Sequence, residues 1–273
     1  MNTTRLYSSN AAYQLFETLK SNRAKRHRQG VFLVEGVKSI NEALRNGWRV
    51  QSFLYSFERP LSDWATCLLE GIQTDINYEL TQALMDKLSD KTDTSELLAV
   101  AYMREEKPFG HVCDNPILAL FDRPSNKGNL GTLLRSCDAL GAHGLILTGH
   151  CVDIYDPEVV RSSMGSFFRV PFLRLSSNGD IEALLADLRE EYPGLQIIGT
   201  TAHRKKVISE LDLTGPVLFM IGNETGGLNR WLTGQCNVLA TIPMRPDAAA
   251  TSFNVSCAAT VMLYEAARQR GFE

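Results

Sequence analysis

Short apolar runs alternate with helix-like stretches over the first part of the chain. The apolar runs cover residues 31–36, 50–56, 76–80 and 96–103. Between them, at 37–47, 61–71 and 81–90, apolar residues recur at helical spacing. Strand-length runs that alternate with helical patterns predict a small α/β unit in this region.

A second α/β unit is predicted after residue 115. Its candidate strands are almost continuously apolar, as expected when helices cover both faces of a largely parallel sheet. They lie at 116–122, 143–149, 170–175, 196–201, 216–222 and 237–244. A last helix is expected at 252–270, where an apolar stripe is formed by Val255, Ala259, Met262, Leu263 and Ala266. Residues 104–115 have charge, Pro and Gly without periodicity, which predicts a linker between domains at 1–105 and 115–273.

Composition narrows the class of protein. The 273 residues are 44% hydrophobic, enough for a sizeable core, and the formal charge of −3 excludes a globally basic RNA-coating protein. The cysteines and histidines show no metal-ligand spacing, so we expect reduced thiols and no metal. The chain lacks an apolar run of about 18 residues and a signal-peptide pattern, which predicts a cytoplasmic protein with no membrane segment.

Two common nucleotide-binding motifs are absent. No Gly-x-Gly-x-x-Gly follows the first strand of the second unit, and no Gly-x-x-x-x-Gly-Lys-Ser/Thr occurs, which argues against a conventional dinucleotide site or a P-loop. Ligands of open α/β sheets bind beyond the carboxyl ends of the strands. Three segments at such positions carry candidate chemistry.

The first segment, 122–135, runs from a strand through a Pro/Asn/Gly turn into a helix that contains Asn129 and Arg135. Arginine offers a planar fork for phosphate, and asparagine offers both a donor and an acceptor. A capped helix start with a surface arginine is the alternative interpretation.

The second segment, 219–228, is a strand that enters a glycine-rich turn. Gly222 is expected to let a ligand approach the backbone, and Glu224 stands where a carboxylate can order a sugar, a base or an arginine. A plain glycine-rich loop is the alternative.

The third segment joins the Pro243 turn to the start of the last helix. Ser252 is a candidate cap for that helix. Capping by Ser252 leaves unexplained the polar residues Asn254 and Ser256 near the start of an otherwise apolar helix.

Together the three segments resemble the motifs of the SpoU, or TrmH-like, RNA ribose 2′-O-methyltransferases. The matching patterns are Pro-x-Asn-x-Gly-Asn with a later Arg, Ile-Gly-Asn-Glu-x-x-Gly-Leu, and Ile-Pro-Met followed by Ser-x-Asn-Val-Ser, in this order between Pro116 and Arg270. The resemblance implies an α/β domain with a deep trefoil knot, bound S-adenosylmethionine, and a homodimer with the site at its interface. It also implies an RNA partner, with ribosomal RNA favoured over transfer RNA.

The resemblance assigns two groups of site residues. The cofactor is expected at Thr200, Thr201, Ala202, Gly222, Ile242, Met244 and Phe253, and the catalytic group is expected to be Asn129, Arg135, Glu224, Ser252 and Asn254. An arginine side chain is a poor base at neutral pH, because it holds its proton too strongly to give it up in a protein. We therefore expect Arg135, oriented by Glu224 and Asn129, to grip a phosphate and stabilise the developing alkoxide. The link at 245–251 and Phe253 depart from the family pattern, which leaves the shape of the loop near the cofactor open.

The amino-terminal unit resembles the ribosomal protein L30e-like substrate-binding module of these enzymes, through the stretch Gly30–Gly36 and the helix after it. A dense basic segment precedes it, and we expect RNA contacts from Arg23, Lys25, Arg26 and Arg28. A solvated basic helix end is the alternative. Two other functions stay open, a knotted methyltransferase that acts on an RNA base and a catalytically silent RNA-binding protein.

Overall fold

A computed structural model describes residues 2–203 and 205–272. Contacts divide the chain into two compact units, Met1–Glu105 with Asp153–Phe168, and Glu106–Val152 with Arg169–Glu273. No helix in the described part of the chain is both long and apolar enough to cross a membrane.

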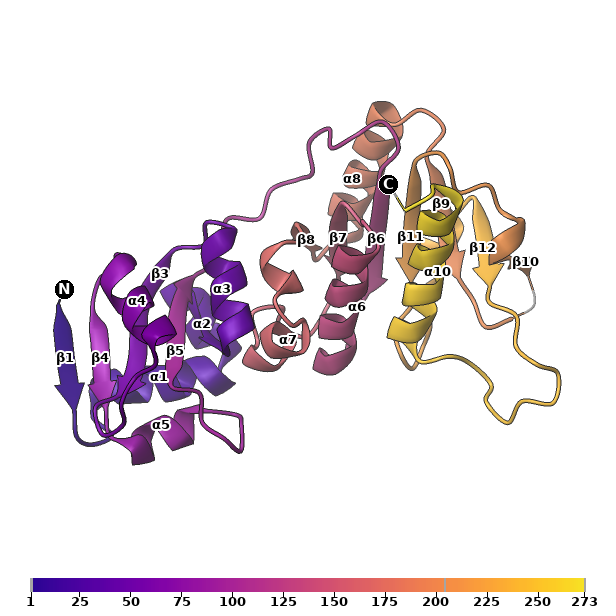
Figure 1. The fold of residues 1–273 in the computed structure, drawn as a ribbon. Coiled ribbons are helices and arrows are strands. Elements are labelled where there is room, and N and C mark those ends of the chain that lie inside the picture. Colours follow the sequence, from indigo (N-terminus) through magenta and orange to yellow (C-terminus); the bar gives the residue numbers. More distant parts are fainter. Residues whose placement is uncertain (1, 204, 273) are drawn as a thin grey trace. The chain divides into compact units, whose positions relative to one another are not determined.

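The N-terminal unit is built on a five-stranded sheet in the order β1-β4-β3-β5-β2 (Figure 1). The strands are β1 (Thr3–Leu6), β4 (Asn77–Leu80), β3 (Val50–Ser56), β5 (Leu97–Tyr102) and β2 (Val31–Glu35). β1, β4 and β3 are parallel, whereas β5 runs antiparallel to both of its neighbours. The helices of this unit are α1 (Ala11–Ser21), α2 (Arg23–Gln29), α3 (Val37–Arg45), α4 (Asp63–Gly71), α5 (Gln82–Leu88) and α7 (Pro157–Ser162).

The second unit carries a seven-stranded sheet, parallel throughout, in the order β10-β12-β9-β11-β6-β7-β8. Its strands are β6 (Ile117–Asp122), β7 (Gly144–Thr148), β8 (Phe172–Leu175), β9 (Gln196–Thr200), β10 (Lys206–Val207), β11 (Val217–Ile221) and β12 (Val238–Thr241). The six apolar runs predicted after residue 115 all form strands of this sheet. The predicted α/β class with a largely parallel sheet is therefore confirmed.

Helices cover both faces of the parallel sheet. The helices are α6 (Lys127–Ala139), α8 (Asn178–Glu191), α9 (Arg230–Gln235) and α10 (Val255–Gln269). Side chains of α8 and α9 pack with Leu118, Leu120, Leu218 and Met220 in one core cluster. On the other face α6 packs along α10, as Figure 1 shows. Burial on both faces explains why these strands have continuous apolar sequences.

The segment 153–168 belongs by its contacts to the N-terminal unit, although it follows the first strands of the second sheet in sequence. The predicted division into 1–105 and 115–273 did not include this excursion. Phe167 packs within 5.5 Å of Phe32 and 5.3 Å of Trp48, measured between ring centroids. The Trp48 indole also donates a 3.1 Å hydrogen bond to the carbonyl of Phe168. An aromatic cluster thus holds the segment in place.

Candidate active site

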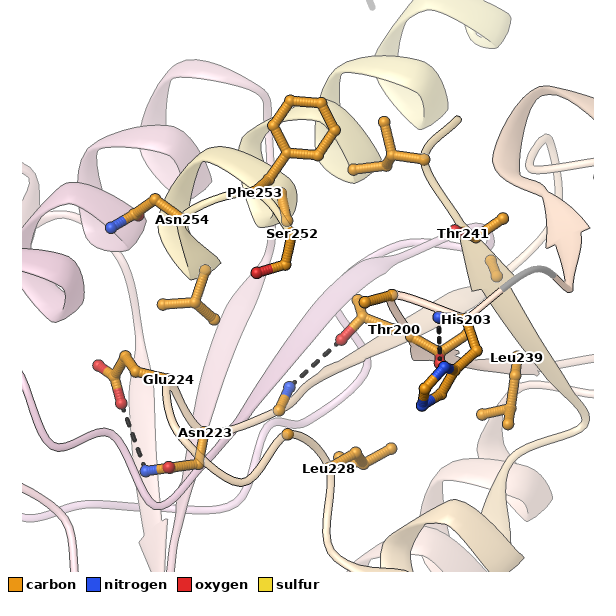
Figure 2. Close-up of a pocket in the computed structure, with 18 of the residues that line it drawn as sticks. Thr200, His203, Asn223, Glu224, Leu228, Leu239, Thr241, Ser252, Phe253 and Asn254 are labelled. Atoms are coloured by element: carbon orange, nitrogen blue, oxygen red, sulfur yellow. Dashed lines mark hydrogen bonds between the residues drawn. The ribbon is translucent and has the colours of Figure 1, made fainter. Parts of the chain in front are cut away.

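The carboxyl ends of β9, β11 and β12 and the start of α10 surround a cavity of about 750 Å³ (Figure 2). In a parallel sheet these strand ends meet at one edge, which is where ligands of open α/β sheets bind. The predicted residues that line the cavity are Asn129, Thr200, Thr201, Ala202, Gly222, Glu224, Ile242, Met244, Ser252, Phe253 and Asn254. Residues of the three motif segments and of the turn after β9 are thus brought to one place.

The Glu224 carboxylate accepts hydrogen bonds from the turn that follows β6. Its Oε2 accepts from the amide and hydroxyl of Ser125 at 3.1 and 2.8 Å, and its Oε1 accepts from the amide of Asn126 at 3.2 Å. The side-chain amides of Asn129 and Asn223 each donate to it at 3.3 Å. Glu224 therefore joins the turn after β11 to the turn after β6.

This environment keeps Glu224 ionised. Partial burial raises the pKa of Glu224, but hydrogen bonds from its own backbone amide, from Ser125 and from Asn129 lower it by more, so the pKa lies below its ordinary value. A carboxylate with a low pKa is a weak base at neutral pH. The geometry therefore suits an anchoring role for Glu224 rather than proton transfer.

Asn129 connects all three motifs. Its side-chain amide donates to Glu224, while its Oδ1 accepts from the Nδ2 of Asn254 at 3.1 Å and from the hydroxyl of Ser256 at 3.4 Å. With both ends of its side chain engaged, Asn129 has a fixed orientation at the edge of the cavity.

Asn254, and not Ser252, caps the last helix. The Asn254 Oδ1 accepts from the amides of Ser256 and Cys257 at 3.0 and 3.4 Å, and α10 begins at Val255. The expectation that Ser252 caps a helix from residue 252 is therefore wrong. Ser252 instead lines the cavity, on the same side as Phe253 and across from Thr200 and Asn223 in Figure 2.

Gly222 is required by a close approach of the chain to itself. A Cβ at this position would lie 2.2 Å from the amide nitrogen of Leu228 and 2.4 Å from the carbonyl carbon of Gly227. The amide of Gly222 donates to the Thr200 hydroxyl at 3.3 Å, which ties β11 to β9 (Figure 2). Gly222 lines the cavity, where we predicted that a ligand approaches it, and the backbone that leaves no room for a side chain there is that of residues 227–228.

The cavity fits an adenosyl-type cofactor in size and lining. Its volume lies within the roughly 300–1,000 Å³ typical of small-molecule sites. Leu228, Leu239 and Met262 supply apolar walls, while Thr200 and Thr201 supply hydroxyl groups. This mixture suits a ligand with a flat aromatic part and a polar sugar.

Arg135 is the one predicted catalytic residue outside this cavity. It lies on α6 with an exposed side chain and is absent from the cavity lining among the described residues. Glu224 and Asn129 bond to the turns after β6 and β11 and to the start of α10. Among the described residues, their hydrogen bonds do not include the expected one to Arg135.

Arg26 cannot contribute to the predicted RNA-binding patch. It is 1% exposed, and its Nε donates to Asp153 at 2.7 Å while its NH2 donates to Asp156 at 3.2 Å. Its NH1 also donates to the carbonyl of Leu19 at 2.8 Å. Its neighbours Arg23, Lys25 and Arg28 stand on the same short helix α2.

The sequence argument missed several residues that order or line the site. Ser125 donates two hydrogen bonds to Glu224, and the side-chain amide of Asn223 donates to the carbonyl oxygen of Arg123 at 2.7 Å. His203 lines the cavity. Ser125 and Asn223 lie inside the recognised motifs, and this position was the available signal. His203 had none. In residues 2–203 and 205–272, no group of three or more His, Cys, Asp or Glu side chains is placed to hold a metal ion.

Comparison with known families assigns both parts of the chain. A model described as the SpoU rRNA methylase family matches residues 116–264, and a model described as the SpoU L30e-like domain matches residues 10–99. Among curated relatives, the chain is 41% identical to the 23S rRNA (uridine(2479)-2′-O)-methyltransferase of Streptomyces viridochromogenes, over 97% of this chain and 92% of that protein. It is 27% identical to the 23S rRNA (guanosine(2553)-2′-O)-methyltransferase RlmP of Bacillus subtilis (strain 168), over 88% and 90% respectively.

Solved structures agree with these matches. The SpoU methyltransferase AviRb from Streptomyces viridochromogenes, in complex with AdoMet, superposes with a TM-score of 0.89 at 40% identity and covers 96% of this chain and 98% of its own. The AdoMet-bound rRNA methyltransferase from Sinorhizobium meliloti gives a TM-score of 0.83 at 26% identity, with 97% and 98% covered.

Proposed function

The chain belongs to the SpoU rRNA methylase family, and we propose that it transfers a methyl group from S-adenosylmethionine to a ribose 2′-hydroxyl of ribosomal RNA. The observation that carries the proposal is the joining of Asn129, Glu224 and Asn254 by hydrogen bonds at the edge of a cofactor-sized cavity. Ribosomal RNA is favoured over transfer RNA because the relatives with the names quoted above act on 23S rRNA. A ribosomal substrate implies action in the cytoplasm.

The residues proposed to hold the cofactor are those that line the cavity from the ends of β9, β11 and β12, including Thr200, Gly222, Ile242 and Met244. S-adenosylmethionine supplies a methyl group on a positively charged sulfur, so the leaving group needs no further activation. The task of the protein is to hold the ribose oxygen in line with that methyl group and to stabilise the oxygen as it loses its proton. Alignment of this kind needs no metal.

The roles of the polar residues follow from their environments. Asn129 and Glu224 hold the turn after β6 against the turn after β11, which gives the floor of the substrate site a fixed shape. Ser252 and Asn254 present polar groups above it. Arg135 is proposed to bind the phosphate beside the reacting ribose and to stabilise negative charge on the 2′-oxygen, because a guanidinium offers a planar fork of hydrogen-bond donors.

A homodimer is proposed to complete this site. The outer side of α10 exposes Val261 (37%) and Tyr264 (47%) at helical spacing, an apolar surface suited to burial against a second copy. α6, which carries Arg135, packs along α10. We therefore propose that Arg135 reaches the cavity of the partner subunit. Because the chain belongs to the SpoU family, we also propose that its carboxyl-terminal segment forms the deep trefoil knot of that family.

The N-terminal unit is proposed to bind the RNA through the basic residues of α2, namely Arg23, Lys25 and Arg28. These phosphate contacts would be independent of base sequence and dependent on salt. A base-directed methyltransferase is disfavoured because the quoted curated relatives are named for 2′-O-methyl transfer. A silent RNA-binding protein is disfavoured because the family motifs retain their polar residues together around the cavity.

Methyl transfer to isolated RNA tests the function. Purified protein with labelled S-adenosylmethionine should methylate protein-free 23S ribosomal RNA and leave transfer RNA unlabelled. Label in transfer RNA alone would contradict the ribosomal assignment. Absence of label from both RNAs, in protein that binds the cofactor by calorimetry, would favour the silent RNA-binding protein.

The role of Arg135 is tested by a substitution that keeps its charge. Arg135→Lys loses the planar fork and should slow single-turnover transfer by about 10²–10³-fold, the scale for loss of one donor to a developing oxyanion. RNA affinity should change far less, because the interaction strengthens only in the transition state. A rate within about threefold of the parent would remove Arg135 from the catalytic group.

A further inference from the structure

An aromatic pair, the exposed Tyr7 and the half-buried Phe57, stands at the carboxyl edge of the N-terminal sheet. Tyr7 follows β1 and Phe57 follows β3, and these strands flank β4 in parallel, with Leu6, Leu80 and Ser56 in register. The ring centroids of Tyr7 and Phe57 lie 5.5 Å apart in an edge-to-face arrangement. Tyr7 is 69% exposed, although burying an aromatic ring away from water is energetically favourable.

A cation belongs to the same surface. Arg5 and Leu6 are neighbours in β1, so Arg5 lies on the face of the sheet opposite Leu6, which is buried in the core, and Tyr7 directly follows the strand. The Arg5 guanidinium lies 4.7 Å from the Phe57 ring centroid and bonds the Glu79 carboxylate at 2.7 Å. Hydrogen bonds to Glu79 and then to Tyr7 raise the pKa of Arg5. The contacts hold Arg5 beside the rings.

We propose that Tyr7, Phe57 and Arg5 form a platform on which an unpaired nucleobase of the RNA substrate stacks. Aromatic side chains and guanidinium planes on an open sheet face are the groups that bind unstacked RNA bases. The exposed Arg59, two residues after Phe57, lies at the same edge and suits the phosphate beside such a base. This inference rests on the proposed function only for the identity of the ligand as RNA.

The platform extends beyond the part of the unit that defines the family domain. The SpoU L30e-like model matches residues 10–99, so β1 and Tyr7 precede it, whereas Phe57 and Glu79 lie within it. β1 adds an edge strand, and its pairing with β4 brings Arg5 and Tyr7 alongside Phe57, as the left side of Figure 1 shows for β1 and β4. β1 supplies Arg5, and the residue directly after β1 is Tyr7, so two of the three stacking groups come from this part of the chain.

Stacking is tested with a short single-stranded RNA that contains 2-aminopurine, a base whose fluorescence changes when it stacks. The parent and Tyr7→Phe should alter this fluorescence on binding. Tyr7→Ala should lose the change and bind at least about fivefold more weakly, since stacking on one aromatic side chain contributes that much or more. Phe57→Leu, which keeps an apolar side chain without a ring, should also reduce the fluorescence change.

Val37→Ala provides a matched control, because it removes another exposed apolar side chain, 52% exposed, from the same unit. It should bind like the parent. If Tyr7→Ala keeps the parent affinity and fluorescence change, or if the parent itself produces no change, the platform is refuted and the surface fits a protein partner instead. Methyl transfer to 23S ribosomal RNA by the parent reports separately on the proposed function. If the parent transfers no methyl group, the stacking result can still be interpreted, because the fluorescence assay measures RNA binding and not methyl transfer.

Discussion

Replacing Asp153 by alanine is expected to destabilise the N-terminal unit by about 3–5 kcal/mol, the usual cost of removing one partner from a buried ion pair. The Arg26 and Asp153 side chains are only 2% and 3% exposed, so water cannot replace the lost carboxylate. Asp156 would remain at 3.2 Å, but its oxygen reaches NH2 and leaves the Arg26 Nε without an acceptor. His27, whose Nε2 lies 3.1 Å from Asp153, loses the same partner.

The unfolding of this unit can be followed by itself. Trp48 and Trp64 lie in the N-terminal unit, and Trp231, the third tryptophan, lies in α9 of the other. Urea unfolding of a Trp231→Phe background, followed by fluorescence, therefore reports on the N-terminal unit. Arg45→Ala is the control, because its ion pair with Glu42 has a 73% exposed arginine and should contribute at most about 1 kcal/mol.

Lowering the pH should reduce the difference in the free energy of unfolding between the parent and Asp153→Asn. Burial raises the pKa of Asp153, but the charge and hydrogen bonds of Arg26 and then His27 lower it by more, so the folded pKa lies below the ordinary value of about 3.9. A carboxyl group whose pKa is lower in the folded than in the unfolded state stabilises the folded state at pH values above the unfolded pKa. This stabilisation is lost as the pH falls through the pKa of the folded state. A cost for Asp153→Ala no larger than that of Arg45→Ala would refute the reasoning.

Gly222→Ala should abolish the cofactor binding that calorimetry measures, because its Cβ meets the backbone of residues 227–228. Gly234→Ala, where nothing lies within 4 Å and which is away from the cavity lining, should bind like the parent. Replacing Arg23, Lys25 and Arg28 by alanine should flatten the salt dependence of RNA binding by up to about 0.7 per lost phosphate contact and leave cofactor affinity unchanged; an unchanged slope would mean a solvated surface. Tyr264→Arg should give monomers in light scattering and lose methyl transfer, and a dimer that persists would remove α10 from the interface. Co-expressed Arg135→Ala and Asn129→Ala chains should recover roughly a quarter of the parent activity if each active site combines two subunits, because about half of the dimers are mixed and each mixed dimer has one intact site of two. They should recover none if each site lies within one chain.

The catalytic half of the fold was predictable because buried parallel strands produce continuous apolar runs, each followed by a polar or glycine-rich turn. β1 was missed because its residues Thr3, Thr4 and Arg5 are exposed and polar and form no apolar run. Arg26 was misassigned because charge in a sequence normally indicates solvent, and the two carboxylates that bury it lie more than a hundred residues away.

The same limit applies to the site. Motif spacing identified the residues around the cavity, but not the contacts that decide their roles. Capping by Asn254 in place of Ser252 depends on where α10 begins, and the need for Gly222 depends on the path of residues 227–228. The position of Arg135 outside the cavity likewise depends on how α6 packs along α10.

Alkaline hydrolysis of the methylated RNA tests the central claim most directly. Hydrolysis requires a free 2′-hydroxyl, so a methyl group on that oxygen protects the adjoining phosphodiester bond from cleavage. Purified protein, labelled S-adenosylmethionine and protein-free 23S ribosomal RNA should yield label in alkali-resistant dinucleotides, and the label should nearly vanish with Arg135→Ala. Label recovered in mononucleotides, with the methyl group on the base, would contradict the account.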